Sequence, residues 1–318
     1  MKLKPSDQRL LAYLYHHNRE PITKIAKATG LSRDQVEYKI NKWVKEGFIR
    51  KFGTVFNYPK LGYEKFIPMA FNVPEQKLEV FFKSLEKDKN CISVGENIGN
   101  HNVYVIFIFK NDEELNFHLA GFLEKHKNIV QDYILFDPFF TELYPMKPIN
   151  YKDKKPYKLD EKIGPLEKLN NTDKKLLSLL EKDGRMKLVG LAKALNISAE
   201  LAFHKIKKFQ KNGIILGNRL DLDLKKLGYH YSDIFLDVKN LSSETQDKLK
   251  NFARNNDHIN SIMMMFGKPN CMLQVFNRNQ RDLLEIIKEI RKLLGSNLHS
   301  YDLMFPQQEH KLNTLPFL

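Results

Sequence analysis

The sequence predicts an α+β protein of two tandem units, each with three short helices and a β segment followed by a small βαββαβ sandwich. The main observation is an internal repeat, because residues 7–14 and 173–180 both read Asp-x-x-Leu-Leu-x-x-Leu, and the same shift aligns Lys-Leu-Gly-Tyr at 60–63 with 226–229. The second observation is the apolar spacing, which changes from helical to strand periodicity in the same order in both copies.

The composition indicates a globular protein with a polyanionic partner. Apolar residues make up 42% of the chain, and 52 Lys and Arg against 38 Asp and Glu give a formal charge of +14. Such an excess favours nucleic acid as the partner, since cations placed against phosphates release condensed counterions, although a surface decorated with lysine is the alternative explanation.

The cysteines and apolar runs point to the cytoplasm. Cys91 and Cys271 are far apart and have no companion ligands, which fits a reducing compartment and predicts neither a disulfide framework nor a metal site. The first residues lack the apolar core of a signal peptide, and the longest apolar run, 103–109, is too short to cross a bilayer. We therefore expect a cytoplasmic protein without membrane contact.

The first unit begins with three short helices. Leu10, Leu11 and Leu14 lie on one face of a helix over 7–17, and a second helix follows Pro21 and stops at Gly30. A third helix starts at Ser32, which forms a capping box with Gln35, and ends at Gly47. Three helices with a four-residue turn before the third are typical of a helix-turn-helix.

The third helix carries the candidate nucleic-acid contacts. We expect Val36, Ile40, Trp43 and Val44 to point inward, and 48–56, interrupted by Gly53, to form a short wing hairpin. The corresponding elements of the second copy are helices over 173–180, 187–195 and 198–212 and a wing over 214–222.

Base contacts are assigned to Arg33, Tyr38 and Asn41, because Arg and Asn can hydrogen-bond base edges in pairs, while lysines suit phosphates. The second copy is basic mainly at the end of its third helix, which favours backbone contacts there. A solvated face or a protein-docking module is the alternative. The full candidate set for DNA is Ser32, Arg33, Gln35, Tyr38, Lys39, Asn41, Lys42, Lys45, Arg50 and Lys51, with His204, Lys205, Lys207, Lys208 and Lys211.

The second half of each unit predicts a ferredoxin-like sandwich. Strands over 66–73, 91–97, 102–110 and 130–136 alternate with helices over 75–87 and 113–125, and the second copy repeats this order between 231 and 305. One sheet face in each copy needs cover, so we expect the two copies to pair face to face as an intramolecular pseudo-dimer, with a homodimer as the alternative.

Five segments follow from this division. They are a winged helix-turn-helix domain (1–60), a ferredoxin-like effector and oligomerisation domain (61–145), a Lys- and Pro-rich linker (146–168), a second winged helix-turn-helix domain (169–226) and a second ferredoxin-like domain (227–318).

The helix-turn-helix halves resemble the Lrp/AsnC transcription regulators. The resemblance rests on Asp-x-x-Leu-Leu at 7–11, Ile-Ala-Lys-x-x-Gly-Leu-Ser at 25–32, Trp-x-x-Glu-Gly-Phe-Ile at 43–49 and Lys-Leu-Gly-Tyr at 60–63. It implies sequence-specific binding of double-stranded DNA and a small-molecule effector, with no cofactor. By the same resemblance the effector candidates are Gly99, Asn100, His101, Asn102, Gly267 and Asn270, for which an ordinary hairpin turn is the alternative.

Two rival functions have the same layout. Sirohaem decarboxylases share it, and His101 before Asn102-Val103-Tyr104 is a faint echo of them, without a counterpart in the second copy. A winged-helix module that docks proteins is the other rival. The sequence has no Gly-rich phosphate loop or nucleophile elbow, and on this basis we expect a regulator and not an enzyme.

Overall fold

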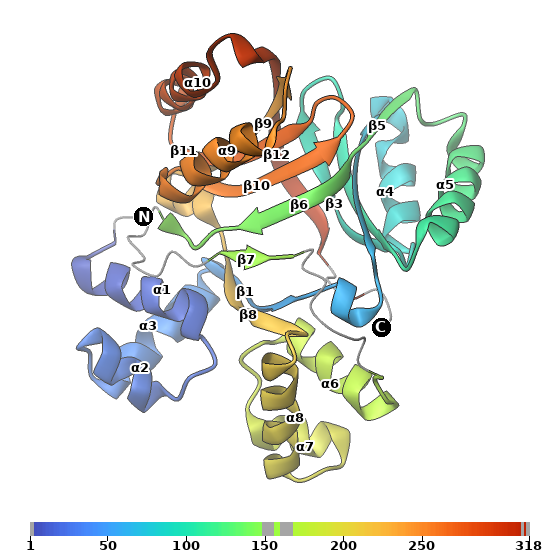
Figure 1. Ribbon diagram of the computed structural model, residues 1–318. Coiled ribbons are helices and arrows are strands. Elements are labelled where there is room, and N and C mark those ends of the chain that lie inside the picture. The colour runs from blue at the N-terminus through green and yellow to red at the C-terminus, as the bar shows by residue number, and fades with distance from the viewer. Residues whose placement is uncertain (1–2, 148–155, 160–167, 313–314, 316–318) are drawn as a thin grey trace.

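The computed structural model describes residues 3–147, 156–159, 168–312 and 315, so most of the expected linker lies outside the described residues. Two helix-turn-helix units lie on one side of the molecule and two helix-covered sheets on the other (Figure 1). The α+β class and the order of elements in both copies agree with the prediction.

The first helix-turn-helix unit consists of α1 (Pro5–His17), α2 (Ile22–Thr29) and α3 (Arg33–Lys45). The predicted capping box is present, because the Gln35 backbone N–H donates to Ser32 Oγ and the Ser32 N–H donates to Gln35 Oε1. Gly30 ends α2 in the left-handed region, with φ 70°. Val36, Ile40 and Trp43 are buried as expected, whereas Val44 is 45% exposed and its predicted inward position is wrong.

The second unit has the same three helices, α6 (Asn171–Lys182), α7 (Leu188–Leu195) and α8 (Ala199–Lys211). Asn170 caps α6 by accepting from the Asp173 N–H at 2.9 Å, and Ser198 caps α8 by accepting from the Leu201 N–H at 3.0 Å. The repeat in the sequence therefore corresponds to two three-helix units whose third helices both start at a capping serine.

The predicted wing hairpins are wrong. Each wing segment is one strand, and β1 (Ile49–Phe56) pairs antiparallel with β8 (Ile215–Leu222) of the other unit. Gly53 lies opposite Arg219, and a Cβ at Gly53 would be 3.1 Å from the Arg219 carbonyl oxygen. The glycine thus permits close approach of two backbones and does not form a turn.

The paired strands also exchange cores. Leu220 and Leu222 of β8 pack in the core of the first helix-turn-helix unit, and Phe56 of β1 packs in that of the second. Each three-helix unit therefore completes its core with a strand from the other copy.

Each sandwich has the predicted βαββαβ order. The first contains β2 (Lys65–Asn72), α4 (Leu78–Glu86), β3 (Cys91–Ile98), β4 (Val103–Phe109), α5 (Asp112–His126) and β5 (Asp132–Leu135), continued by β6 (Asp137–Leu143) and followed by β7 (Tyr157–Lys158). The second contains β9 (His230–Val238), α9 (Ser243–Asn255), β10 (Ile259–Phe266), β11 (Cys271–Asn277), α10 (Gln280–Leu294) and β12 (Leu298–Leu312).

The two sheets are joined at both edges. The first part of β12 pairs with β9 and its continuation pairs with β3, while β6 of the first copy pairs with β10 of the second. The resulting strand order is β5-β2-β4-β3-β12-β9-β11-β10-β6-β7. In the second copy β12 is therefore longer than predicted, and in the first copy β5 is continued by a separate strand, β6, because the later part of each segment pairs with the other sheet.

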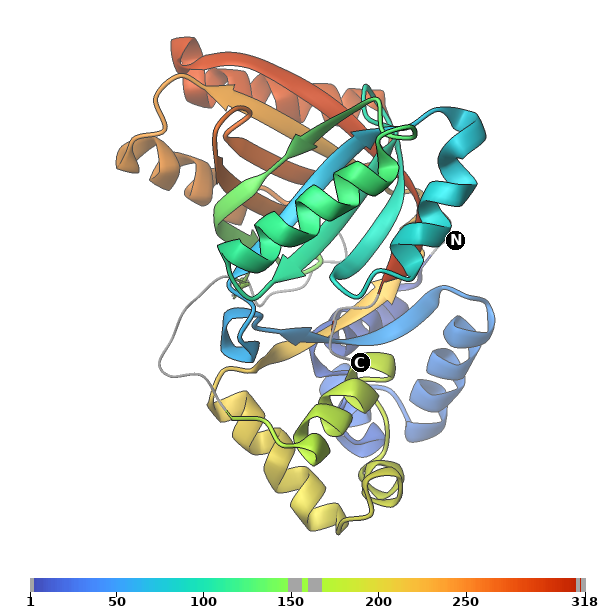
Figure 2. The same ribbon diagram turned by 90° about the vertical axis from the view of Figure 1, so that its right-hand side faces the viewer.

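Between the sheets lies an apolar cluster drawn from both copies, namely Ala70, Phe136, Phe235, Met263, Met265 and Met304. The rings of Phe136 and Phe235 stack with centroids 5.1 Å apart. Helices α4 and α5 cover the outer face of the first sheet, and α9 and α10 that of the second (Figure 2). Among the described residues no helix is long and apolar enough to span a bilayer.

Candidate nucleic-acid interface and the cleft between the helix-turn-helix units

The outer face of α3 is exposed along its length. Arg33, Tyr38 and Asn41 all lie on it, and the Tyr38 side chain is 67% exposed. Lys42 and Lys45 follow on the same face, and Lys42 Nζ lies 3.8 Å from Glu46 Oε1. The buried positions of the same helix hold it against α1 and α2, so the exposed side chains stand on a rigid element.

Two of the predicted phosphate ligands form ion pairs between the third and first helices of their units. Lys39 pairs with Asp7 in the first turn of α1, and at the equivalent place Lys205 Nζ lies 2.7 Å from Asp173 Oδ1 in the first turn of α6. The side chains of Lys39 and Lys205 are only 22% and 21% exposed.

The pairing with Lys39 lowers the pKa of the Asp7 carboxyl. Burial by itself would raise the pKa of Asp7, but hydrogen bonds from Lys39 and from the Lys4 backbone N–H outweigh it and hold the pKa below its usual value.

Arg50 and Lys51 join the two units. Arg50 Nη2 donates to Asp221 Oδ1 at 2.9 Å, across the β1–β8 ladder, and Lys51 pairs with Glu181, a buried residue of α6. Their predicted role at phosphates is not supported by this arrangement, because both cations already have an acidic partner from the other copy.

The outer face of α8 carries the other predicted cations. Lys207, Lys208 and Lys211 are exposed, and Lys207 Nζ lies 5.7 Å from the centre of the Phe203 ring. His204 is also exposed, with Nε2 3.7 Å from Glu200 Oε1. The helix therefore presents a basic and partly aromatic face.

The effector candidates lie in two hairpin turns. The Asn102 side chain accepts from the Val73 N–H at 2.9 Å and donates to the Val73 carbonyl at 2.7 Å, and Asn270 does the same with Val238. His101 is buried beside Asp132, with its Nε2 3.2 Å from the carboxylate. The side chains of Asn102, Asn270 and His101 thus form hydrogen bonds within the protein, near the two turns. Gly99 and Gly267 have positive φ, and Asn100 is exposed.

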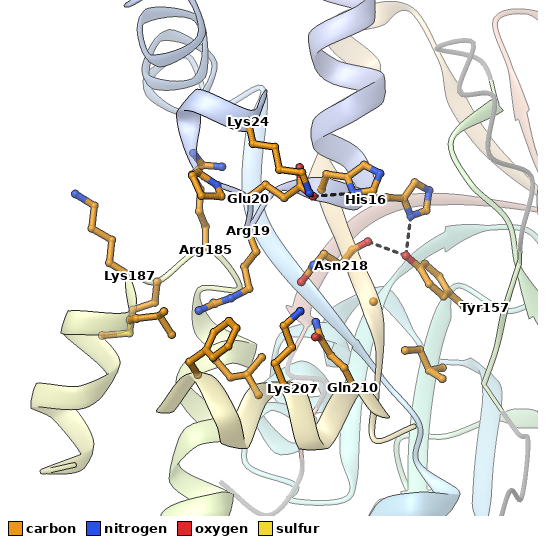
Figure 3. Close-up of a pocket in the computed structure, with 18 of the residues that line it drawn as sticks. His16, Arg19, Glu20, Lys24, Tyr157, Arg185, Lys187, Lys207, Gln210 and Asn218 are labelled. Carbon is orange, nitrogen blue, oxygen red and sulfur yellow. Dashed lines mark hydrogen bonds and ion pairs between the residues drawn. The ribbon is translucent and has the colours of Figure 1, made fainter. Parts of the chain in front are cut away.

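A cleft of about 1390 Å³ lies between the two helix-turn-helix units. Figure 3 shows Arg19, Glu20 and Lys24 from the first unit facing Lys207 and Gln210 of α8. Sequence reasoning did not find this site, because its lining comes from two units and from the segment around Tyr157, with no local motif.

Two arginines at equivalent positions of the repeat cross the interface beside the cleft. Arg19 Nη1 donates to the Gly184 carbonyl at 2.8 Å, and Arg185 Nη1 donates in return to the Asn18 carbonyl. Burial lowers the pKa of both guanidinium groups, and the Asp183 carboxylate opposes the effect. The two hydrogen bonds link the units reciprocally.

The cleft has an excess of positive charge. Its two carboxylates are both paired, Glu20 with Lys24 at 2.6 Å and Glu142 with Arg254 at 2.5 Å. In the part of the chain that the structure describes, no acid lies within ion-pair distance of four further cations of the cleft, Arg19, Arg185, Lys187 and Lys207. At one end His16 Nδ1 lies 2.6 Å from the Tyr157 hydroxyl, which donates to the Asn218 carbonyl.

Fold and surface together define a helix-turn-helix protein with paired α+β sandwiches. A family model described as winged helix-turn-helix DNA-binding matches residues 169–215. The HTH-type transcriptional regulator FL11 of Pyrococcus abyssi is 30% identical over 116 residues, which are 36% of this chain and 77% of that protein. FL11 of Pyrococcus horikoshii is 28% identical over 110 residues, 35% of this chain and 73% of its own. The chain belongs to this family of helix-turn-helix transcriptional regulators.

A different protein shares the fold over nearly the whole chain. The crystal structure of the sirohaem decarboxylase NirDL has a TM-score of 0.67 at 15% identity, covering 98% of this chain and 94% of that one. The structure of its complex with an iron-uroporphyrin III analogue has a TM-score of 0.64 at 16% identity, covering 94% of this chain and 88% of that one. The expectation that this chain is not an enzyme is contradicted by this likeness, since an enzyme has the same fold.

Proposed function

We propose that the chain is a sequence-specific DNA-binding transcription regulator of the Lrp/AsnC type. The observation that carries the proposal is the exposed face of α3, where Arg33, Tyr38 and Asn41 stand opposite a fully packed face. Guanidinium and amide groups can each make two hydrogen bonds to one base edge in the major groove, and the N-terminal part of such a helix usually reaches the bases.

Phosphate contacts are assigned to the exposed lysines alone. Lys42, Lys45, Lys207, Lys208 and Lys211 are the predicted cations that keep an exposed side chain on α3 or α8. Ser32 and Gln35 act on DNA binding through the start of α3, whose first turn they fix. The ion-paired side chains Lys39, Arg50, Lys51 and Lys205 position the helices.

The pairing of β1 with β8 supports a single chain that acts as a pseudo-dimer. In this proposal the domains run over 1–60, 61–145, 169–226 and 227–318, with the linker between the two copies. The joined sheets hold both helix-turn-helix units in one relation, as two DNA half-sites require.

The first test replaces Arg33 by alanine. Loss of a bidentate base contact costs about 1–3 kcal/mol at the preferred base and relaxes the sequence preference there. Selection of bound fragments from random duplex DNA measures this preference for the wild type and for Arg33→Ala.

Lys208→Ala is the matched control on α8. It is expected to weaken binding to all sequences about equally and to reduce the salt dependence, because each phosphate contact contributes about one unit to the slope. An unchanged preference in Arg33→Ala together with an altered one in Lys208→Ala contradicts the assignment.

A second candidate function is a reaction on a carboxylated tetrapyrrole. It is favoured by the whole-chain likeness to a sirohaem decarboxylase and by the cationic cleft, which suits several carboxylates. Visible absorbance during titration with sirohaem, and mass spectrometry of the product, test it. A shifted absorbance band with loss of carbon dioxide supports this function, whereas an unchanged spectrum and unaltered sirohaem exclude it.

A further inference from the structure

We propose that the cleft between the helix-turn-helix units binds a small molecule with several carboxylate or phosphate groups, and that this ligand competes with DNA for the outer face of α8. The second half rests on the proposed regulator function, whereas the first half stands on the cleft itself.

The charges of the cleft call for an anion. Arg19 and Arg185 enter it from the two units, and Lys187 and Lys207 approach from α7 and α8. The two acids of the cleft are already paired, and among the described residues no acid lies within ion-pair distance of these four cations, although Asp183 acts on both arginines from further away. Bound carboxylates or phosphates would supply compensating charge, and arginine in particular favours their planar, paired oxygens.

The walls favour a ligand with an apolar frame. Between the cations lie Ile22, Met186, Leu188, Phe203 and Leu216, so the lining is mostly apolar, with charges at separate points. A volume of about 1390 Å³ exceeds what a single phosphate or acetate fills, and ligand sites combine such apolar walls with a few placed polar groups. We infer a ring or comparable frame that carries anionic groups around its edge.

Competition with DNA follows from the geometry of α8. Phe203, Lys207 and Gln210 lie on one side of the helix, at spacings of four and three residues, and all three line the cleft. A ligand held there covers Lys207, one of the three α8 lysines that the regulator presents to DNA. Lys208 and Lys211 do not line the cleft, so they keep their contact with solvent when it is filled.

The binding test uses the full chain and isothermal titration with benzene hexacarboxylate, an apolar ring with six carboxylates. Benzoate, with the same ring and one charge, is the ligand control, and inositol hexakisphosphate is the phosphate counterpart. Tighter binding of one hexa-anion than the other identifies the anionic group preferred.

The variants separate the cleft from general surface charge. The double variant Lys187→Gln, Lys207→Gln removes two cleft cations and is expected to weaken the binding of benzene hexacarboxylate by about tenfold or more. Lys193→Gln with Lys208→Gln removes the same charge from α7 and α8 outside the cleft, and binding should stay within about twofold. Equal weakening in both double variants, or no binding of either hexa-anion by the wild type, overturns the site.

Competition is tested by DNA-binding assays at constant ionic strength, with and without benzene hexacarboxylate. The apparent DNA affinity of the wild type should fall as ligand is added, and Lys187→Gln should need more ligand for the same fall. If the chain binds the ligand but does not bind DNA, the proposed regulator function is wrong and the proposed anion site in the cleft is still supported. Unchanged DNA affinity in the presence of bound ligand would contradict the competition alone.

Discussion

At the residue scale, Asp233 ends a chain of hydrogen bonds that begins in the first helix. Arg219 donates to the Tyr15 hydroxyl and, at 2.9 Å, to Asn260, whose amide donates to Gln274 at 2.6 Å. Gln274 donates to Asp233 at 3.0 Å, inside the second sandwich. Burial raises the pKa of Asp233 to about 7, and the hydrogen bond from Gln274 only partly opposes this. The network thus contains a carboxyl group that keeps its proton to a higher pH than an exposed aspartate does.

Asp233→Asn should remove a pH dependence of stability. The folded protein binds the Asp233 proton more tightly than the unfolded chain, where the pKa is about 3.9, so this residue lowers the free energy of unfolding as pH rises from about 4 to 7. Between pH 4 and pH 8 the free energy of unfolding of the variant should therefore rise by about 2–4 kcal/mol relative to that of the wild type. Urea unfolding at the two pH values measures the gain.

The exposed Asp302 on the neighbouring β12 provides the control for this experiment. Asp302→Asn should follow the wild type at both pH values. A wild-type and an Asp233→Asn curve that change in parallel between pH 4 and pH 8 would show that Asp233 has no such preference for its proton.

The sequence predicted which charged side chains are exposed better than it predicted which acids they pair with. The sequence identified the exposed cations of α3 and α8, but it assigned Lys39 and Lys205 to phosphates. Their acidic partners lie 32 positions away along the chain and become neighbours only when the third helix packs on the first. A periodic pattern reports which face a residue occupies and not which distant charge it meets.

At the element scale, helices were predicted well because their signals are local. Ser32 with Gln35 and the left-handed Gly30 mark the ends of α3 and α2 within a few residues of sequence. Strand partners carry no such mark, and the segment around Gly53 looks the same whether it folds back on itself or pairs with another strand. The cleft was missed for a similar reason, since its residues converge only after β1 and β8 have paired.

Gly184→Ala tests how closely the second unit packs on β1. The Gly184 N–H donates to the Phe52 carbonyl at 2.7 Å, and a Cβ at Gly184 would also lie 2.7 Å from that oxygen. Because the oxygen belongs to a backbone, relief requires movement of the strand, and we expect a loss of about 1–3 kcal/mol in unfolding free energy. Chemical denaturation measures it.

Gly121→Ala in α5 is the matched substitution, since a Cβ there meets no atom within 4 Å. Better helix propensity should raise stability by about 0.5–1 kcal/mol. If both alanine variants were to unfold alike, the close contact of Gly184 with β1 would have no energetic weight.

At the scale of the whole molecule, the two copies complete each other in three places. They share the β1–β8 ladder, they exchange β6 and β12 between the sheets, and Arg19 and Arg185 bridge the helical units. The sequence repeat predicted two similar units that meet, and the apolar cluster between the sheets agrees with that. The exchanged edges were not predicted, because the continuation of a strand onto a second sheet follows from the position of the other copy.

Dividing the chain within 148–155 tests this mutual dependence. Without the other half, β3 loses β12 and β10 loses β6, which leaves exposed strand edges prone to pairing. Each half alone should be recovered as a dimer or an aggregate, and the two halves expressed together should copurify through a tag on one of them. A half that is soluble and monomeric in sedimentation would show that the exchanged edges are dispensable.

The reciprocal bridge of Arg19 and Arg185 joins two units whose third helices are not alike. Two identical chains related by a twofold axis look the same from either direction along a duplex, and they match a palindrome. Here α3 offers Arg33 and Asn41 where α8 offers Ala199 and Lys207. Bound to DNA, this molecule would therefore present two different helices to the two half-sites. Its site would be asymmetric, and the protein would bind in one orientation along the double helix.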